Sequence, residues 1–309
     1  MGRYVARRLL QMIPVFIGST FLIFAMMYAL PGDPVRALMG DQAYDPAVVA
    51  SIRSDLGLDQ PLWQQYLTYM SNLVQGDFGT EIASQREIAD IIAQAFPITL
   101  RLTLFAFTFT VLVGIGLGVI AGLRPDSVRD RGLLALTLVL ISMPSFVLGY
   151  LMQYIFAFQL GVTTATVQDS ENFGDLMLPA IVLGSLSLAY VARLTRTSMA
   201  ENLRSDYMRT AVAKGLPRRR IIGVHLMRNS LVPVVTFLGT DIGNLMTGAI
   251  VTEGIFNVQG IGKTIFDALT RREGATVVGI ASLIVLVYLL TSLLVDLLYA
   301  VLDPRIRYA

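Results

Sequence analysis

The sequence predicts an all-α membrane protein with six transmembrane helices. Of its 309 residues, 54% are hydrophobic and only 15% are charged, and the mean hydropathy is +0.64. This composition is too apolar for an ordinary soluble domain. Apolar runs close to the length that spans a bilayer, about 20 residues, occupy residues 9–30, 102–123, 133–158, 176–192, 229–252 and 275–295. Each run must satisfy its backbone hydrogen bonds internally in the hydrocarbon core, so each is predicted to be a helix.

The distribution of Lys and Arg predicts that both termini are cytoplasmic. Seventeen of these residues lie in the N-terminal arm, the loop after the second span, the segment 193–228 and the C-terminal tail. Six lie in residues 31–98 and near residues 263–272, and Arg101 at a helix end is left unassigned. Because basic residues concentrate on the cytoplasmic side, the loop 31–98 is predicted to be extracytoplasmic.

The first apolar run is predicted to be an uncleaved membrane helix. It follows basic residues as a signal peptide would, but it is longer than a typical signal-peptide core and lacks a small-residue cleavage pattern before Pro31. No linker or internal repeat stands out, so residues 1–309 are interpreted as one membrane domain.

The extracytoplasmic loop between the first two spans is predicted to be helical. Asp45 and Pro46 are typical of an N-cap and a first helical residue, and Gly57 would close that helix. A second helix is expected between Pro61 and Gly76. One face of it carries Trp63, Tyr66, Leu67, Met70 and Val74. Such a face suits the bilayer interface, a partner protein, or packing as a lid on the membrane domain.

Two features of the spans concern helix packing and bending. Gly114, Gly118 and Gly122 repeat every four residues, a spacing that lets a second helix approach closely. We interpret them as packing residues rather than substrate contacts. Pro144 interrupts the third span and favours a kink, because it frees a backbone carbonyl. Both a moving gate and a simple bend remain open for that kink.

Asp241 is the one acidic residue near the middle of a predicted span. Burying an ionised carboxylate there is costly, so such a residue usually faces water, a polar partner or a transport pathway. Asn244 follows three residues later and would share its helix face. A pathway-lining role for Asp241 and Asn244 and a structural hydrogen bond to a neighbouring helix both remain open.

Several chemical functions are disfavoured by the residue inventory. The chain has no cysteine, which excludes thiolate chemistry and disulfides, and its single histidine, His225, excludes two-histidine zinc motifs. Gly262-Lys263-Thr264 matches the end of a phosphate-binding loop, but Asn257 stands where that motif needs its first glycine. We interpret this match as chance. Neither a catalytic constellation nor a nucleic-acid-binding pattern is found.

The basic segment 206–233 is the most informative part of the chain. Its charge could simply satisfy orientation or contact anionic headgroups. Its pattern adds more: Ala211 and Ala213 lead to Gly215, a break follows at Leu216-Pro217, and three arginines begin a second helical stretch. The segment is therefore predicted to form two short helices that dock on another protein, with small residues at the tip and arginines suited to an acidic groove.

This segment resembles the cytoplasmic loop of permease subunits in ATP-binding cassette importers, in the dipeptide/oligopeptide/nickel branch. The matching residues are Asp206–Leu216, Arg219-Arg220, His225, Arg228-Asn229 and Leu231–Pro233. The general importer signature begins with Glu-Ala-Ala, whereas this chain has Arg209-Thr210-Ala211, as that branch commonly does. Further matches run through the chain at Arg7–Leu10, Pro31–Pro34, Leu56–Pro61, Gly76–Gly79 and Asp296–Arg307. Together they resemble the first permease subunit of that branch.

The resemblance implies a multi-pass protein of the bacterial cytoplasmic (inner) membrane that pairs with a second, homologous permease as a heterodimer. Two cytoplasmic ATPase subunits would hold ATP and Mg²⁺, and an extracytoplasmic solute-binding protein would deliver peptide or a related small solute. This chain would hold no cofactor or metal and perform no chemistry. Its coupling loop (residues 196–228) would contact the ATPases through Asp206, Tyr207, Arg209, Thr210, Ala211, Ala213, Lys214, Gly215, Leu216, Arg219, Arg220 and His225.

The cargo is left open between dipeptide, longer peptide, nickel chelate and glutathione. The rival from another class is an ion-coupled secondary transporter that works alone. Such a transporter would need several midplane carboxylates and usually an inverted repeat. Only Asp241 meets the first condition, and no repeat is found.

Overall fold

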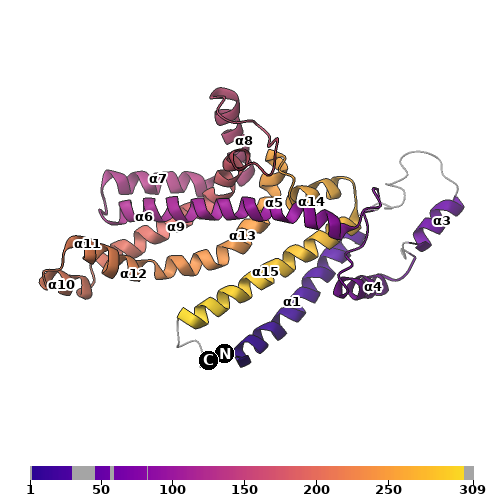
Figure 1. The fold of residues 1–309 in the computed structure, drawn as a ribbon, viewed down its shortest axis with the longest axis horizontal. Coiled ribbons are helices and arrows are strands. Elements are labelled where there is room, and N and C mark those ends of the chain that lie inside the picture. The colour runs from indigo at the N-terminus through magenta and orange to yellow at the C-terminus, as the bar shows by residue number, and fades with distance from the viewer. Residues whose placement is uncertain (1, 30–45, 56–58, 82, 303–309) are drawn as a thin grey trace. The chain divides into compact units, whose positions relative to one another are not determined.

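The computed structural model describes residues 2–29, 46–55, 59–81 and 83–302 (Figure 1). All regular secondary structure in this part of the chain is helical, and its only strand-like pairing is an isolated bridge between Thr80 and Glu87. The predicted capping residue Asp45 and the helix-closing Gly57 lie outside the described residues. Contacts divide the chain into two compact units, Met1–Thr99 with Gln259–Ala309 and Leu100–Val258. Each unit is described by itself below.

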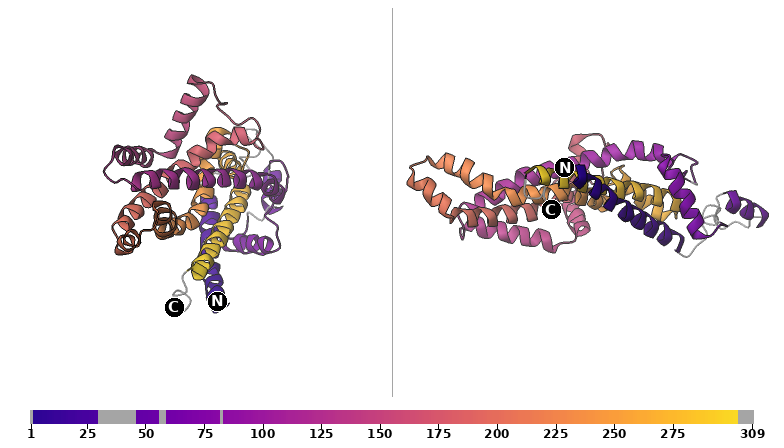
Figure 2. Two further views of the ribbon diagram at one scale, coloured as in Figure 1. Left: turned by 60° about the vertical axis from the view of Figure 1, so that its left-hand side comes forward. Right: turned by 90° about the horizontal axis from the view of Figure 1, so that it is seen from below.

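Unit 1 is built on two long helices, α1 and α15, that run antiparallel side by side (Figures 1 and 2). Near the chain ends, Arg8 Nη2 lies 3.1 Å from Asp296 Oδ1. The first residues of α1 and the last described residues of α15 therefore lie at the same end of the unit. The elements of unit 1 are α1 (Gly2–Ala29), α3 (Pro46–Asp55), α4 (Leu62–Val74), the first part of α5 (Ile88–Phe109), α14 (Ile261–Thr270) and α15 (Gly274–Leu302).

The short helix α4 packs across α1 and α15 through aromatic side chains. Tyr66 and Phe24 make an edge-on ring contact at 5.5 Å, and both belong to a small buried cluster with Val278. Tyr69 donates a hydrogen bond of 2.8 Å to Ser282. Burial raises the pKa of Tyr69 to about 12, against the opposing effect of that hydrogen bond. Tyr69 is therefore neutral at ordinary pH and keeps the proton that it donates to α15.

Unit 2 surrounds a central helix, α9. In the most apolar 18-residue stretch of α9, 67% of the residues are buried, whereas 39% are buried in the corresponding stretch of α13. Helix α9 is therefore the one around which the others pack. It contacts α6, α7 and α13. The elements of unit 2 are the end of α5, the π-helical η1 (Thr110–Gly114), α6 (Ile115–Gly122), α7 (Val128–Ser142), α8 (Ser145–Met152), the π-helical η2 (Gln153–Gln159), α9 (Phe173–Leu203), α10 (Asp206–Ala213), α11 (Arg218–Arg220), the π-helical η3 (Ile221–Leu226), α12 (Met227–Ser230) and α13 (Val232–Phe256).

The described helices include five that are long and apolar enough to cross a membrane, or six if one bent pair forms a single span. The five cover Val5–Met27, Ile88–Gly122, Phe173–Leu203, Val232–Phe256 and Gly274–Leu297. The prediction of an all-α chain is thus confirmed, with five or six candidate spans. The second candidate span begins at Ile88, well before the predicted residue 102. Helix α5 starts at Ile88 and continues without a break into η1 and α6, so all three belong to one span.

The sixth span depends on the interruption at Pro144. Helix α7 ends at Ser142 and α8 begins at Ser145, with Met143 and Pro144 in extended conformations between them. The two helices meet at 108°, so this is a break rather than the kink that the sequence predicted. Beyond the break, Gly149 of α8 lies close to the side chains of Ile255 and Phe256 in α13.

The glycine repeat of the second span lies against α9. An ideal Cβ at Gly118 would stand 2.5 Å from the Thr195 Cβ and 2.6 Å from the Ala192 carbonyl oxygen. At Gly114 and Gly122 the nearest atoms likewise belong to α9, at 3.0 Å and 2.6 Å. Close approach of the two helices therefore requires glycine here, which is the geometry of small-residue packing.

Gly118→Ala is expected to destabilise unit 2, whereas Gly116→Ala is not. A methyl at Gly118 meets the backbone of α9, which cannot rotate away, and overpacking of this kind costs about 1–3 kcal/mol. Gly116 lies in the same helix with nothing within 4 Å of its ideal Cβ, so it is the matched control. Thermal stability of the two purified variants checks the expectation. Equal stability would contradict the close packing of α6 on α9.

Candidate functional site

The coupling loop of residues 196–228 begins within α9, which continues to Leu203, and goes on as a helical hairpin. Helix α10 starts after Ser205, whose carbonyl accepts bonds from Met208 and Arg209. It ends near Lys214, and α11, η3 and α12 then lead the chain to α13. The two short helices that the sequence predicted on either side of Gly-Leu-Pro are thus present (Figure 1).

Gly215 makes the turn between these helices. Its φ of +70° is in the left-handed region, where residues other than glycine are strained. The Gly215 N–H donates to the Val212 carbonyl at 2.9 Å, and the Leu216 N–H donates to the Ala211 carbonyl at 3.3 Å. This pair of bonds is the Schellman motif, which satisfies the last carbonyls of α10. An ideal Cβ at Gly215 would meet nothing within 4 Å, so the requirement for glycine comes from the backbone angle rather than from crowding.

The inner side of the hairpin has its own core. Met208 and Ala211 are buried with Met199 of α9, and Ile221 and Leu226 complete the cluster. Val119 and Leu123 at the end of α6 pack against the same cluster, as do Leu203, Leu216 and Met227. The hairpin, α9 and α6 therefore share one apolar contact region within unit 2.

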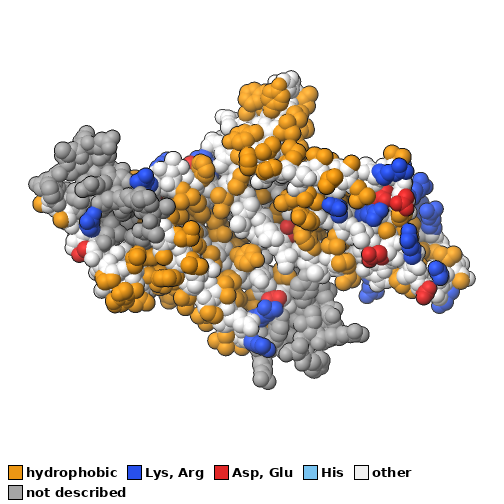
Figure 3. All heavy atoms as spheres, turned by 180° about the vertical axis from the view of Figure 1, so that it is seen from behind, with side chains coloured by type: hydrophobic (Ala, Val, Ile, Leu, Met, Phe, Trp, Pro, Cys, Tyr) orange, Lys and Arg blue, Asp and Glu red, His pale blue; other side chains and the backbone are white. Residues whose placement is uncertain are grey.

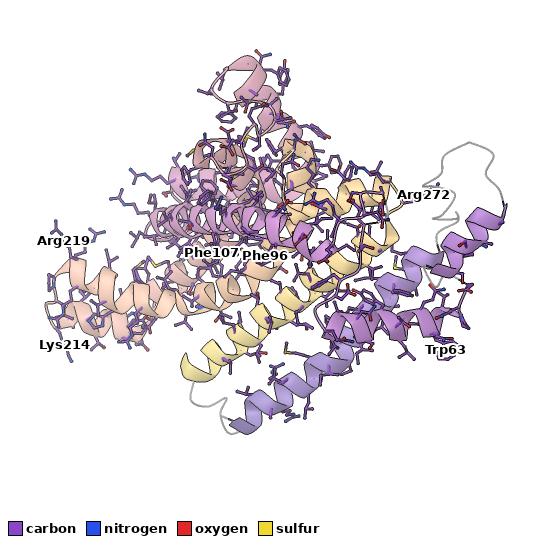
Figure 4. All side chains as sticks on the ribbon, turned by 45° about the vertical axis from the view of Figure 1, so that its right-hand side comes forward. Trp63, Phe96, Phe107, Lys214, Arg219 and Arg272 are labelled. Atoms are coloured by element: carbon purple, nitrogen blue, oxygen red, sulfur yellow. The ribbon has the colours of Figure 1, made fainter. Side chains whose placement is uncertain are left out.

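The outer side of the hairpin is exposed and carries most of the predicted coupling residues. We give the name docking face to nine of these coupling residues together with Val212: Asp206, Tyr207, Arg209, Thr210, Val212, Ala213, Lys214, Gly215, Arg219 and Arg220. Lys214 and Arg219 project outward from the end of the hairpin (Figure 4). Figure 3 shows Lys and Arg side chains gathered over this end of unit 2. His225 and Leu216 are half-buried, and Ala211 is buried.

Two of these placements add to the sequence prediction. Val212 is 64% exposed, an apolar side chain at the tip that the sequence analysis did not single out. Ala211 was expected to be small so that a partner protein could approach the tip. In the structure it is buried, and a small side chain there fits inside the hairpin core. The exposed ion pair of Arg209 with Asp206, at 3.5 Å, contributes little to stability. The role of the docking face in contacting a partner stays a prediction.

A buried ion pair that the sequence analysis missed lies beside the hairpin core. Asp130, in the first turn of α7, is 1% exposed. Its carboxylate accepts two bonds from the guanidinium of Arg196 in α9, of 2.7 Å from Nε and 2.6 Å from Nη2. The Asp126 N–H donates a third bond to it at 2.8 Å, and the Ser127 hydroxyl caps α7. This arrangement joins the α6–α7 turn to the part of α9 where the coupling loop begins.

Asp241 and Asn244 differ in their surroundings although they are three residues apart in α13. Asp241 is 2% exposed, and its Oδ1 accepts a hydrogen bond of 2.8 Å from Ser187 in α9. Its Oδ2 is also buried, with no hydrogen-bond partner in the structure. Asn244 is exposed. The structural hydrogen bond is therefore present, and the pathway-lining role of both residues stays a prediction.

Gly262-Lys263-Thr264 lies in the first turn of α14 and forms no phosphate-binding loop there. Lys263 Nζ is 2.6 Å from Asp267 Oδ2, one turn further along the same helix. Among the described residues, no group of three or more acidic or histidine side chains is placed to hold a metal ion.

Comparisons with known proteins identify the family. Residues 114–308 match the family model described as binding-protein-dependent transport system inner membrane component, and residues 1–103 match the N-terminal model of such membrane components. The di/tripeptide transport system permease protein DppB of Pseudomonas aeruginosa is 40% identical, over 99% of this chain and 98% of that protein. The dipeptide permease DppB of Escherichia coli is 39% identical, over 100% and 99%. The glutathione transport system permease protein GsiC of Escherichia coli is 39% identical over the whole of both chains.

The chain belongs to the binding-protein-dependent transport system inner membrane components. It is accordingly a multi-pass protein of the bacterial inner membrane. Two solved structures share its fold. One is titled an amino acid transporter of the ATP-binding cassette class with histidines, with a TM-score of 0.54 at 17% identity over 68% of this chain and 92% of that chain. The other is titled the inward-facing MetNI methionine transporter, with a TM-score of 0.55 at 16% identity over 69% and 96%.

Proposed function

We propose that this chain is one of two homologous permease subunits that together form the transmembrane path of an ATP-binding cassette importer for peptides. The observation that carries this proposal is the full-length similarity to permeases named for di/tripeptide, dipeptide and glutathione transport. A solute-binding protein outside the membrane would deliver the cargo. A related small solute, such as a nickel chelate, would use the same architecture.

The energy for transport would come from two cytoplasmic ATPase subunits that hold ATP and Mg²⁺, and this chain would not itself be an enzyme. The docking face suits an acidic groove on such a subunit, because its exposed side chains include Arg209, Lys214, Arg219 and Arg220. Behind it, the shared core of the hairpin, α9 and α6 would carry ATPase motion to the spans as a rigid-body movement. Nucleotide and cargo would shift the equilibrium only through different affinities for the two states.

This proposal places both termini in the cytoplasm and the loop 31–98 outside. The antiparallel pairing of α1 with α15 supports two termini on one side of the membrane. The excess of Lys and Arg near the docking face supports the cytoplasm as that side.

ATP-driven uptake in membrane vesicles tests the proposed energy source. With both permeases and both ATPases present, uptake of peptide should require ATP and continue after the proton gradient is collapsed. The control is the same vesicle preparation without the ATPase subunits, which should not transport. Gradient-driven transport by this purified chain alone would instead establish a secondary transporter.

Asp241 and Asn244 are proposed to line the path between the two permeases in at least one nucleotide state. Cysteine introduced at either position in this cysteine-free chain should then react with a water-soluble thiol reagent in the assembled complex. Cysteine at Ala249, which is fully buried in the same helix, is the matched control and should stay protected. Protection of both test positions in every nucleotide state would leave Asp241 as a structural partner of Ser187 alone.

A further inference from the structure

Within unit 1, helix α4 is fixed at a definite depth along two candidate spans, α1 and α15. Tyr66 Oη lies 2.9 Å from Thr20 Oγ1 and donates to the Ile17 carbonyl at 2.9 Å. Thr20 precedes the last residue of its span, Met27, by seven residues. With a rise of 1.5 Å per residue, the contact lies about 10 Å inside the end of the span.

The second attachment gives the same depth independently. Tyr69 donates to the Ser282 hydroxyl, and Ser282 follows the first residue of the last span, Gly274, by eight residues. That separation corresponds to about 12 Å along α15. Because α1 and α15 are antiparallel, both values are measured from the same side of the membrane. Amphipathic helices in the bilayer interface insert their apolar face about 5–10 Å into the boundary between headgroups and acyl chains.

The surface of α4 is divided into three strips. Tyr66, Tyr69 and Met70 face α1 and α15. An uncovered apolar strip contains Trp63, Leu67 and Val74, which are 61%, 57% and 82% exposed. These three positions are spaced i, i+4 and i+11, so they share one helix face. Most of the remaining surface is polar, with Gln64, Thr68, Ser71 and Asn72 exposed and Gln65 half-buried, whereas Leu62 at the first residue of the helix is exposed and apolar.

The composition of α4 favours lipid over a water-soluble partner as the occupant of the apolar strip. The helix contains no charged residue. The tyrosine hydroxyls that anchor this helix lie about 10 Å inside the span ends, at a depth where lipid rather than water surrounds the spans. Trp is also a side chain typical of the membrane–water boundary, since its ring is apolar and its N–H can bond to water or headgroups. Figure 4 shows Trp63 projecting from α4 on the side away from Arg272, which follows α14.

We propose that α4 is an interfacial helix whose strip of Trp63, Leu67 and Val74 inserts into the lipid at the Met27 end of α1. The polar strip then faces headgroups and water. Tyr66 and Tyr69 tie the helix to α1 and α15, so that α4 sets the height of these two spans in the bilayer. Since α4 is uncharged, its insertion does not require anionic lipid.

Trp63 is the chain's single tryptophan, so its own fluorescence tests the proposal. The assembled transporter is placed in vesicles of zwitterionic lipid, with and without bromine on the acyl chains near the headgroup. The signal of Trp63 is the difference between the unaltered complex and a Trp63→Phe complex. We expect a blue-shifted emission, strong quenching by the brominated lipid and little quenching by aqueous iodide.

The matched control moves the tryptophan to the polar strip of the same helix. In the Trp63→Phe background, Gln64→Trp should reverse the pattern, with a several-fold larger iodide quenching constant and weaker quenching by lipid. Three outcomes would overturn the proposal. They are iodide quenching of Trp63 equal to that of the control, absence of any bromine effect, and loss of the bromine effect when the solute-binding protein is added.

Discussion

Gly215→Val is expected to abolish ATP-driven uptake while the chain still inserts into the membrane. A left-handed conformation costs an ordinary residue about 1–2 kcal/mol, and a β-branched residue adopts it least readily. With valine, the φ of +70° would be lost, and with it the two hydrogen bonds that close α10. The docking face would then no longer present α10 and α11 in one arrangement. Uptake by vesicles and co-purification of the ATPases measure the effect.

A series at Gly215 separates backbone strain from crowding by a partner. Asparagine tolerates the left-handed region, so Gly215→Asn should retain more uptake than Gly215→Ala, and Gly215→Val should retain least. The matched control is Gly223→Val, since Gly223 is also exposed in the loop, has nothing within 4 Å of its ideal Cβ and has no positive φ. Normal uptake and normal ATPase co-purification with Gly215→Val would contradict the coupling role of the turn.

The helices and the hairpin turn were predictable because they depend on local chemistry. The apolar runs at 229–252 and 275–295 correspond to α13 and α15, and the glycine at 215 stands where α10 must end. The direction in which a small residue faces was not predictable in the same way. Ala211 was expected at a docking surface, but it is buried in the hairpin core together with Met199 and Met208. Only the packing of the loop on α9 and α6 decides that direction.

The size of the bend at Pro144 and the pairing of Asp130 with Arg196 are also non-local. Proline indicates that a helix is interrupted, but the 108° angle depends on what the next helix packs against, here Ile255 and Phe256 beside Gly149. Asp130 and Arg196 are 66 positions apart, and each has an ordinary local explanation. An acid in the first turn of α7 is typical of a capped helix start, and an arginine near the end of a span is typical of the cytoplasmic side.

Arg196→Gln is expected to destabilise the transporter strongly and to reduce uptake. It removes the guanidinium and, with it, two of the three hydrogen bonds described for the Asp130 carboxylate. The carboxylate is 1% exposed and keeps the bond from the Asp126 N–H. Leaving a buried charged group without its partner costs about 3–5 kcal/mol. Because the Arg196 side chain is 22% exposed, we expect a cost near the lower end of that range. Arg196→Lys should be intermediate, because an ammonium cannot make the paired bonds of 2.7 and 2.6 Å.

The double variant Asp130→Asn with Arg196→Gln distinguishes an ion pair from two independent effects. Removing both charges leaves no buried ion, so the double variant should be clearly more stable than the sum of the single changes predicts. Thermal stability of the purified complex gives this coupling, and ATPase activity with uptake reports whether the α6–α7 turn still moves with the coupling loop. We expect the single Arg196→Gln variant to hydrolyse ATP with less uptake per ATP consumed. If the stability changes are additive and the ratio of uptake to hydrolysis is unchanged, Asp130 and Arg196 have no role in carrying motion from the docking face to the spans.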